Sequence, residues 1–451
     1  MKKKLFAVLT FCLIFISSIL TLSGCATMLK TGPGKSDAVT GNGSLTVRKG
    51  DYLYFVNGYI SNSSLSDKDN NYGKVRDGAI YRAKLDNGKL MYDIKKDDEN
   101  NEIKTLKNIE LVVPKVAGFE YSNLYIFGDT LYFSSPTIEK DAEGKIRFDL
   151  TDIYAVNING GKIKQLAKSL NFTSKEDFNL TQVDDCLFLT YLSDNNLYNL
   201  KIKNQKVENK KIIAENVTSV VFSQTEQESN FVYYTRGFKE GEHSKNGNVL
   251  AKAELKTNKE TILLQDNYNA YNVKMVKNNT IYYSYTNSLT TNEYLYSKSL
   301  SNFAENEKQL TFVSYSNPII VNLLDETVIV TLHNDKLIMV KGTKNPNDDV
   351  VVLSENKVTT LGVFGEFVYY VNSSNKLART NLKTLKEEIL TDTELYLDAK
   401  TNFDFNGDSY VYYFVKVDGK NSKTGYYLNR LELNTSDAES EFLGVKSKNF
   451  E

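Results

Sequence analysis

The sequence is poor in the residues that most often carry out chemistry or cross-link small folds. Its 451 residues contain no tryptophan, two histidines, three cysteines and five prolines. With so few Cys and His side chains, a zinc site is not expected. Common catalytic signatures are also missing: there is no Gly-x-Ser-x-Gly elbow, no His-Glu-x-x-His, no Cys-x-x-Cys and no phosphate-binding glycine run. We therefore predict no cofactor and no recognisable set of catalytic residues.

An excess of charge of one sign is missing too. The formal net charge is −1, with no long block of one sign, so a nucleic-acid partner is not expected. What is present is a globular composition, 41% hydrophobic and 25% charged, with 30 Tyr and 23 Phe. Abundant aromatic residues and scarce proline favour β-strands.

The N-terminus carries the most specific motif. A basic start, MKKK, precedes an apolar stretch over residues 5–22 and the sequence Leu-Ser-Gly-Cys at 22–25. Eighteen apolar-rich residues lie at the lower limit of a membrane span, so hydropathy alone does not separate a signal peptide from an anchor. Leu-Ser-Gly-Cys resembles the lipobox of bacterial lipoproteins.

The resemblance implies that residues 1–24 are a signal peptide and that the Cys25 thiol carries a diacylglyceryl group. Two acyl chains give stable anchoring, whereas one holds a protein only marginally. We therefore expect the protein at the outer face of the bacterial cell membrane, with the lipid bilayer as a partner through acylated Cys25. The alternative is an uncleaved signal anchor with a chance cysteine.

The segment after the lipobox lacks hydrophobic periodicity. Residues 25–43 are therefore predicted to form a flexible tether, followed by one folded unit over residues 44–451. With Cys12 removed and Cys25 acylated, Cys186 is the remaining thiol, so no internal disulfide is expected. Because it stands in the strand-like sequence DDCLFL, we predict that it is buried and inert.

One phrase recurs along the chain: a polar turn followed by an aromatic strand. It reads GDYLYFV from Gly50, GDTLYF from Gly128, NNTIYY from Asn278 and GEFVYYV from Gly365. Eight such strand cores follow one another, mostly at intervals of roughly 40–50 residues, which is typical of a β-propeller. The fold class is therefore all-β, a β-propeller of about eight four-stranded antiparallel blades. The competing count is seven blades with an irregular insertion between residues 95 and 120.

The surrounding sequence supports this architecture. Each core follows one strand and precedes two more, and it is apolar on consecutive positions, as expected for a strand covered on both faces by neighbouring blades. The turn residues tolerate positive φ. Both ends of the folded unit form whole blades, which predicts that the ring closes by packing, without a strand exchanged between the ends.

The phrase resembles the blades of YWTD-type, low-density-lipoprotein-receptor-like propellers and of related bacterial propellers. The resemblance covers nearly the whole mature chain and implies the fold. The YWTD sequence itself is absent, because there is no tryptophan, so the function of that family is not carried over.

Loops between the second and third strands differ in length. The long ones are predicted at residues 57–79, 134–152, 235–248 and 414–425, in blades 1, 2, 4 and 8. These loops leave the ring on one face, and closure makes blades 8, 1 and 2 neighbours, so we predict a binding face there. Its candidate contact residues, suited to a protein or cell-wall glycan partner, are Tyr59, Tyr72, Arg76, Arg147, Arg236 and His243. The alternative is neutral variation of loop length.

One stretch bears a partial likeness to a calcium loop. The side chains of Asp67, Asp69 and Asn71 have the spacing of its first ligands, but Tyr72 stands where glycine is needed and Gly78 where a bidentate carboxylate is needed. A hydrated loop is the better interpretation.

These observations favour a membrane-tethered extracytoplasmic binding or scaffold protein whose ligand the sequence does not name. The alternative is a carbohydrate-active enzyme of the cell envelope, a hydrolase or lyase using two carboxylates. A sensor or accessory subunit of an envelope complex is a third hypothesis.

Overall fold

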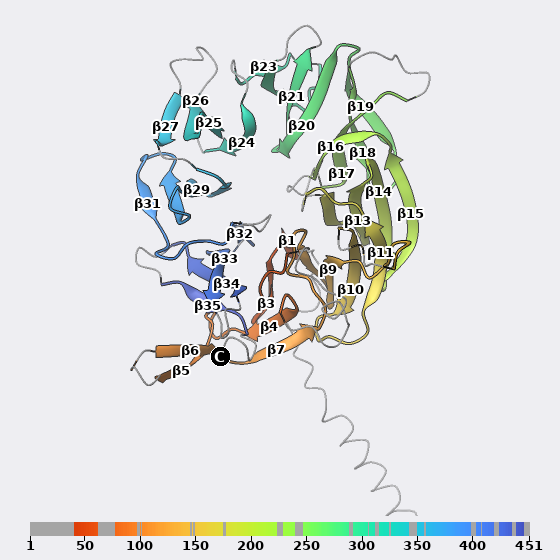
Figure 1. The fold of residues 1–451 in the computed structure, drawn as a ribbon. Helices are drawn as coiled ribbons and strands as arrows, with labels where there is room; N and C mark the ends of the chain where they lie inside the picture. Colours follow the sequence, from red (N-terminus) through yellow and green to blue (C-terminus); the bar gives the residue numbers. More distant parts are fainter. Residues whose placement is uncertain are drawn as a thin grey trace, which may run out of the picture.

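The computed structural model describes residues 40–445, apart from 62–76, 97–99, 101, 145–146, 148, 175–176, 223–228, 240–246, 288–291, 305, 312–314, 324–325, 342–349, 356–357, 398–402, 407, 419–423 and 435–438. The described strands form eight antiparallel blades of four strands each, arranged as a ring (Figure 1); a fifth strand is added to the sheet of blade 2, and two further strands form a separate hairpin. The eight-bladed propeller predicted from the repeats is confirmed, and the seven-blade alternative is wrong. Within the described ranges, no helix has the length and apolar character needed to cross a bilayer.

Blades are numbered along the chain, and each runs from an inner first strand to an outer fourth strand. Blades 1 to 4 comprise β2 (Thr46–Lys49), β3 (Tyr52–Val56), β4 (Ile80–Lys84) and β7 (Ile109–Val113); β8 (Leu124–Phe127), β9 (Thr130–Pro136), β10 (Thr151–Asn157) and β11 (Lys164–Leu170); β12 (Phe178–Val183), β13 (Cys186–Ser193), β14 (Asn196–Lys203) and β15 (Lys206–Ala214); and β16 (Val217–Phe222), β17 (Phe231–Arg236), β18 (Val249–Glu254) and β19 (Glu260–Gln265).

Blades 5 to 8 comprise β20 (Asn269–Lys277), β21 (Thr280–Asn287), β22 (Glu293–Ser299) and β23 (Lys308–Gln309); β24 (Ser316–Asn322), β25 (Thr327–His333), β26 (Lys336–Lys341) and β27 (Val350–Ser354); β28 (Leu361–Phe364), β29 (Phe367–Val371), β30 (Leu377–Asn381) and β31 (Glu387–Ile389); and β32 (Phe403–Phe405), β33 (Tyr410–Asp418), β34 (Thr424–Glu432) and β35 (Glu441–Leu443).

The recurring phrase is the hairpin between the first and second strands of a blade. Gly50, Gly128, Asn278 and Gly365 all have positive φ between 50° and 60°, which is why glycine or asparagine begins each copy. The second strand that follows is buried along nearly its whole length, completely so in β3. Each hydrophobic cluster of the core lies between adjacent blades, for example blades 4 and 5 or blades 5 and 6. The consecutive apolar residues therefore face a blade on either side, as predicted.

Blade 1 carries an insertion between its third and fourth strands. β5 (Tyr92–Lys96) and β6 (Glu102–Leu106) pair as a separate two-stranded hairpin, which projects from the outer rim in Figure 1. The irregular stretch near residues 95–120 thus holds an added hairpin followed by the fourth strand of the blade, and it does not replace a blade.

The ring has two faces, which we name by their connections. The turn face carries the hairpins between first and second strands and between third and fourth strands. The loop face carries the second-to-third connections and the links from blade to blade. In blade 8 most of the predicted long loop at 414–425 is strand. β33 and β34 continue into it as a hairpin with nine residues in each strand.

An additional strand lies inside the ring. β1 (Thr40–Ser44) pairs antiparallel with β8, so it is the innermost strand of blade 2 (Figure 1). Thr40 pairs with Ile126 near the turn face, and Ser44 pairs with Leu124 near the loop face. The chain therefore crosses the ring from the turn face to the loop face before blade 1 begins, and its first described residues fall within the predicted tether. The rest of the predicted tether, Cys25 and the predicted signal peptide lie outside the described residues.

Candidate binding face

The loop face of blades 8, 1 and 2 is built on a tight junction of backbone segments. The amide N of Ile60 donates to Gly118 O at 2.9 Å, and the amide of Gly118 donates to Gly78 O at 2.8 Å. A Cβ on Gly118 would lie 2.0 Å from Gly58 O, and a Cβ on Gly58 would lie 2.4 Å from Tyr426 O. Only glycine allows such an approach, so both ends of the blade 1 loop are firmly fixed.

Blade 8 meets blade 1 at this junction through long-range hydrogen bonds. The side chain of Asn57, which is fully buried, bonds to both backbone polar groups of Val445, with Nδ2–O and Oδ1–N distances of 3.1 and 2.7 Å. The amide of Tyr59 donates to Tyr426 O at 2.8 Å. Together with a hydrophobic cluster that spans blades 8, 1 and 2, these bonds close the ring, and among the strands of residues 40–445 that the structure describes, none is exchanged between blades 1 and 8.

A cluster of tyrosines covers the junction. The rings of Tyr396 and Tyr426 stack with centroids 3.6 Å apart and planes 20° apart. Tyr59 packs against Tyr396 and Phe414, with centroids at 5.5 and 5.7 Å. Tyr396 and Tyr426 are half-buried, whereas Tyr59 is only 5% exposed. Tyr59, a predicted contact residue, therefore lies beneath this surface. The accessible aromatic edges belong to Tyr396 and Tyr426, which the sequence did not single out.

Arg147 lies where a partner could reach it. Its side chain is 46% exposed and pairs with Asp149, whose carboxylate accepts from Nε and Nη2 at 2.9 and 2.7 Å. The hydrogen bonds that Arg147 donates to Asp149 raise the pKa of Arg147, which stays charged. The amide of Arg147 donates to Glu139 O at 3.0 Å, which fixes the turn on which this pair stands in blade 2.

Arg236 has a different environment. Its side chain is completely buried, and Nε donates to Glu260 at 2.7 Å. Tyr234 and Lys239 donate to the same carboxylate at 2.8 Å. Burial alone would raise the pKa of Glu260, but the hydrogen bonds from Arg236, Lys239 and Tyr234 outweigh it and hold this pKa at about 2. Arg236 thus stabilises blade 4 and has no exposed surface for a partner, which the sequence could not show because Glu260 lies two strands away.

The other candidates are not brought together with these. Tyr72, Arg76 and His243 lie outside the described residues, as do Asp67, Asp69 and Asn71. Among the residues that the structure describes, no three His, Cys, Asp or Glu side chains are grouped so that they could hold a metal ion. Cys186 has a free thiol, as expected, but it is half-buried at the edge of a core cluster and not fully enclosed.

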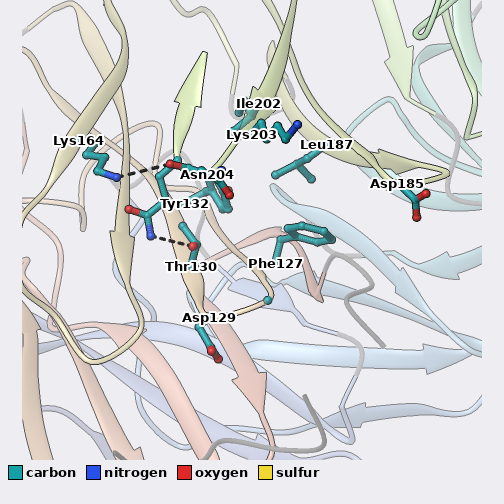
Figure 2. A pocket seen from close by; sticks show the side chains of 12 residues that line it. Phe127, Asp129, Thr130, Tyr132, Lys164, Asp185, Leu187, Ile202, Lys203 and Asn204 are labelled. Carbon is teal, nitrogen blue, oxygen red and sulfur yellow. Dashed lines mark hydrogen bonds between the residues drawn. The ribbon is translucent and has the colours of Figure 1, made fainter. Parts of the chain in front are cut away.

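Sequence reasoning missed a cavity on the turn face, between blades 2 and 3 (Figure 2). Its volume is about 530 Å³. Phe127, Tyr132, Leu187 and Ile202 supply apolar surface, and the polar lining residues are Asp129, Thr130, Lys164, Asp185, Lys203, Asn204 and Gln205. No local signal predicts it, because it depends on the separation of two blades.

Comparisons with known proteins assign no family to the chain. No family model matches the chain, and no curated protein matches it. A solved oligogalacturonate lyase in complex with manganese is 13% identical, with a TM-score of 0.43, covering 75% of this chain and 96% of that one. TolB from Acinetobacter baumannii is 10% identical, with a TM-score of 0.32 and coverages of 74% and 84%. A chain of a nidogen/laminin complex is 11% identical, with a TM-score of 0.27 and coverages of 70% and 90%. The assignment of the fold rests on the strand order given above.

Proposed function

We propose that this protein is a membrane-tethered, extracytoplasmic binding or scaffold protein, and that the loop face of blades 8, 1 and 2 binds its partner. The observation that carries the proposal is the direction of β1. Thr40 pairs with Ile126 near the turn face, so the described part of the chain begins at that face. A lipid on Cys25 would then hold the turn face toward the bilayer and leave the loop face directed away from it.

The predicted tether is long enough to permit this orientation. Residues 26–39 separate the predicted lipid from β1, and at 3.3–3.6 Å per residue they reach at most about 50 Å. The partner most consistent with the surface is a cell-wall glycan or an envelope protein. Tyrosine edges at blade 8 and an accessible arginine on blade 2 suit either one, since aromatic faces pack on sugar rings and Tyr and Arg dominate protein interfaces.

Two measurements test the proposal. In intact cells, the full-length protein is expected in the membrane fraction and Cys25→Ala in the soluble or secreted fraction; membrane retention of the variant would contradict lipid tethering. Sedimentation with isolated cell walls, and cross-linking on whole cells, then report partner capture by the wild-type protein.

The site is tested by Tyr396→Ala, Tyr426→Ala and Arg147→Ala, each checked by circular dichroism for an intact fold. We expect these variants to lose capture at least about ten-fold, the ratio equivalent to 1.4 kcal/mol. The matched control is Tyr268→Ala, a tyrosine that is 49% exposed on the link between blades 4 and 5. Equal capture by all four folded variants would reject this binding face.

A further inference from the structure

The cavity between blades 2 and 3 has charges arranged in a definite order. Asp129 stands on the β8–β9 turn and Asp185 on the β12–β13 turn, both at the inner end of their blades. Lys164 begins β11 and Lys203 ends β14, which belong to the outer half. The cavity therefore has carboxylates toward the ring axis and ammonium groups toward the rim, and Figure 2 shows both lysines above Asp129.

Between the charged groups lies a firm, mostly apolar floor. Tyr132 and Leu187 are 2% and 3% exposed, and Ile202 is 4% exposed. The two blades are joined across the cavity, where Gln205 Nε2 donates to Thr130 Oγ1 at 2.9 Å. Packing of the floor and this bond hold the two blades together at the cavity, which lowers the ordering cost of binding there.

The charged groups are only weakly engaged by the protein. Lys164 Nζ lies 3.5 Å from Asn204 O, and Lys203 Nζ lies 3.8 Å from the exposed Glu208 carboxylate. Among the described residues, no cation lies within ion-pair distance of Asp129 or Asp185. Both signs are thus available to an incoming molecule.

We propose that this cavity binds a small zwitterion, a molecule with an ammonium group and an anionic group separated by a short apolar part. The ammonium would face Asp129 and Asp185, the anion would face Lys164 and Lys203, and the apolar part would cover Phe127 and Leu187. At about 530 Å³, the cavity is in the size range of small-molecule sites. Two sources share this chemistry: the ethanolamine phosphate headgroup of a lipid, and a free amino acid or dipeptide.

The site goes beyond the proposed function, because it is on the opposite face from the predicted partner surface. It is tested by calorimetric titration of the folded chain with phosphoethanolamine, L-alanine and Ala-Ala. Ethanolamine, inorganic phosphate and acetate serve as half-ligands. We expect saturable binding of at least one zwitterion, and at least about ten-fold weaker binding of each half-ligand.

Substitutions test which charged side chains contact the zwitterion. Asp129→Asn, Asp185→Asn and Lys203→Met are each expected to weaken zwitterion binding about five-fold or more. The control is Asp51→Asn, which changes the residue corresponding to Asp129 in the Gly-Asp turn of blade 1, away from the cavity lining. Sedimentation with vesicles of phosphatidylethanolamine against phosphatidylglycerol separates the two sources, since only the headgroup source predicts a preference for the former.

Three results would overturn the proposal: no saturable binding of any zwitterion below about 10 mM, binding of maltose as tight as that of the zwitterions, or equal affinity in Asp129→Asn, Asp185→Asn and the wild type. The first outcome leaves the loop-face proposal unaffected, because no residue of this cavity belongs to that face.

Discussion

Asn57 bonds through its side-chain amide to both the backbone N–H and the backbone C=O of Val445, although 388 residues separate them. The bonds join the loop after the second strand of blade 1 to the segment after the last strand of blade 8. Since no strand of the described part of the chain is exchanged between the two end blades, these bonds belong to the directional contacts that close the ring.

Asn57→Ala should therefore loosen the closure. Leaving the partly buried backbone N–H and C=O of Val445 without a partner should lower the free energy of unfolding by about 1–3 kcal/mol. Hydrogen exchange of residues 441–445 should accelerate. The control is Asn199→Ala, which removes a comparable bond to Leu255 O at 2.7 Å between blades 3 and 4. It should destabilise to a similar extent without exposing β35; equal exchange of β35 in both variants would contradict a special role for Asn57.

A cross-strand set of Tyr, Arg and Glu recurs in blades 1, 7 and 8, which are consecutive in the ring. In blade 7, Arg379 lies opposite Tyr369 and Glu388. The corresponding sets are Tyr54, Arg82 and Glu110, and Tyr412, Arg430 and Glu441. In each, an aromatic ring two residues before the tyrosine lies against the guanidinium, at 4.0 to 5.2 Å.

Arg379→Lys should cost about 1.5–3 kcal/mol, because an ammonium cannot reproduce the forked contact with Glu388 at 2.8 and 2.9 Å together with the bond to Leu433 O of the next blade at 2.8 Å. Urea unfolding of the variant measures this loss. Arg48→Lys, at an exposed arginine, should change stability by less than about 0.5 kcal/mol. Similar losses of unfolding free energy in Arg379→Lys and Arg48→Lys would mean that the buried contacts of the Arg379 guanidinium do not stabilise the fold.

Glu260 makes the protein sensitive to acid. Its pKa in the folded state is about 2, below that of a free glutamate near 4.3, so its stabilisation is complete above pH 5 and is lost as the pH falls toward 2. Glu260→Gln should destabilise at pH 7 by about 2–3 kcal/mol and flatten the acid side of the stability profile. Glu208→Gln, which alters an exposed pair, should leave the profile unchanged. If the unfolding free energy of Glu260→Gln fell as steeply below pH 5 as that of the wild type, the low pKa of Glu260 would be contradicted.

Deprotonation of Lys115 should change the stability of the fold in the alkaline pH range. Lys115 is 4% exposed and lies over the Tyr154 ring at 5.1 Å; burial lowers its pKa to about 8, although Asp152 partly opposes this. Between pH 8 and 10.5 the unfolded chain keeps the proton that the folded chain releases, so stability rises with pH. The free energy of unfolding of the wild type minus that of Lys115→Met should increase by about 2–3 kcal/mol over this range. The exposed Lys168→Met should show no such increase, and a flat difference for Lys115→Met would reject the shift.

The sequence predicted the blades because their signals are local. A glycine or asparagine that adopts positive φ at Gly50, Gly128 or Asn278, followed by a strand with a run of consecutive buried apolar residues, is visible within ten residues. Blade 1's hairpin and β1 were missed because neither repeats. The burial of Arg236 was missed because its partner Glu260 belongs to another strand, and the cavity near Asp129 exists only through the packing of two blades.

The passage of β1 through the ring determines how load enters the molecule. A pull on the chain before Thr40 acts along the axis of β1, so the hydrogen bonds to β8 are loaded in shear and must yield together, whereas a perpendicular pull would break them one at a time. The force therefore acts first on blade 2. Leu45 and β2 bear only the part of the force that the β1–β8 pairing does not take up. Through this one strand, a surface attachment could bear tension without first straining the closure between blades 8 and 1.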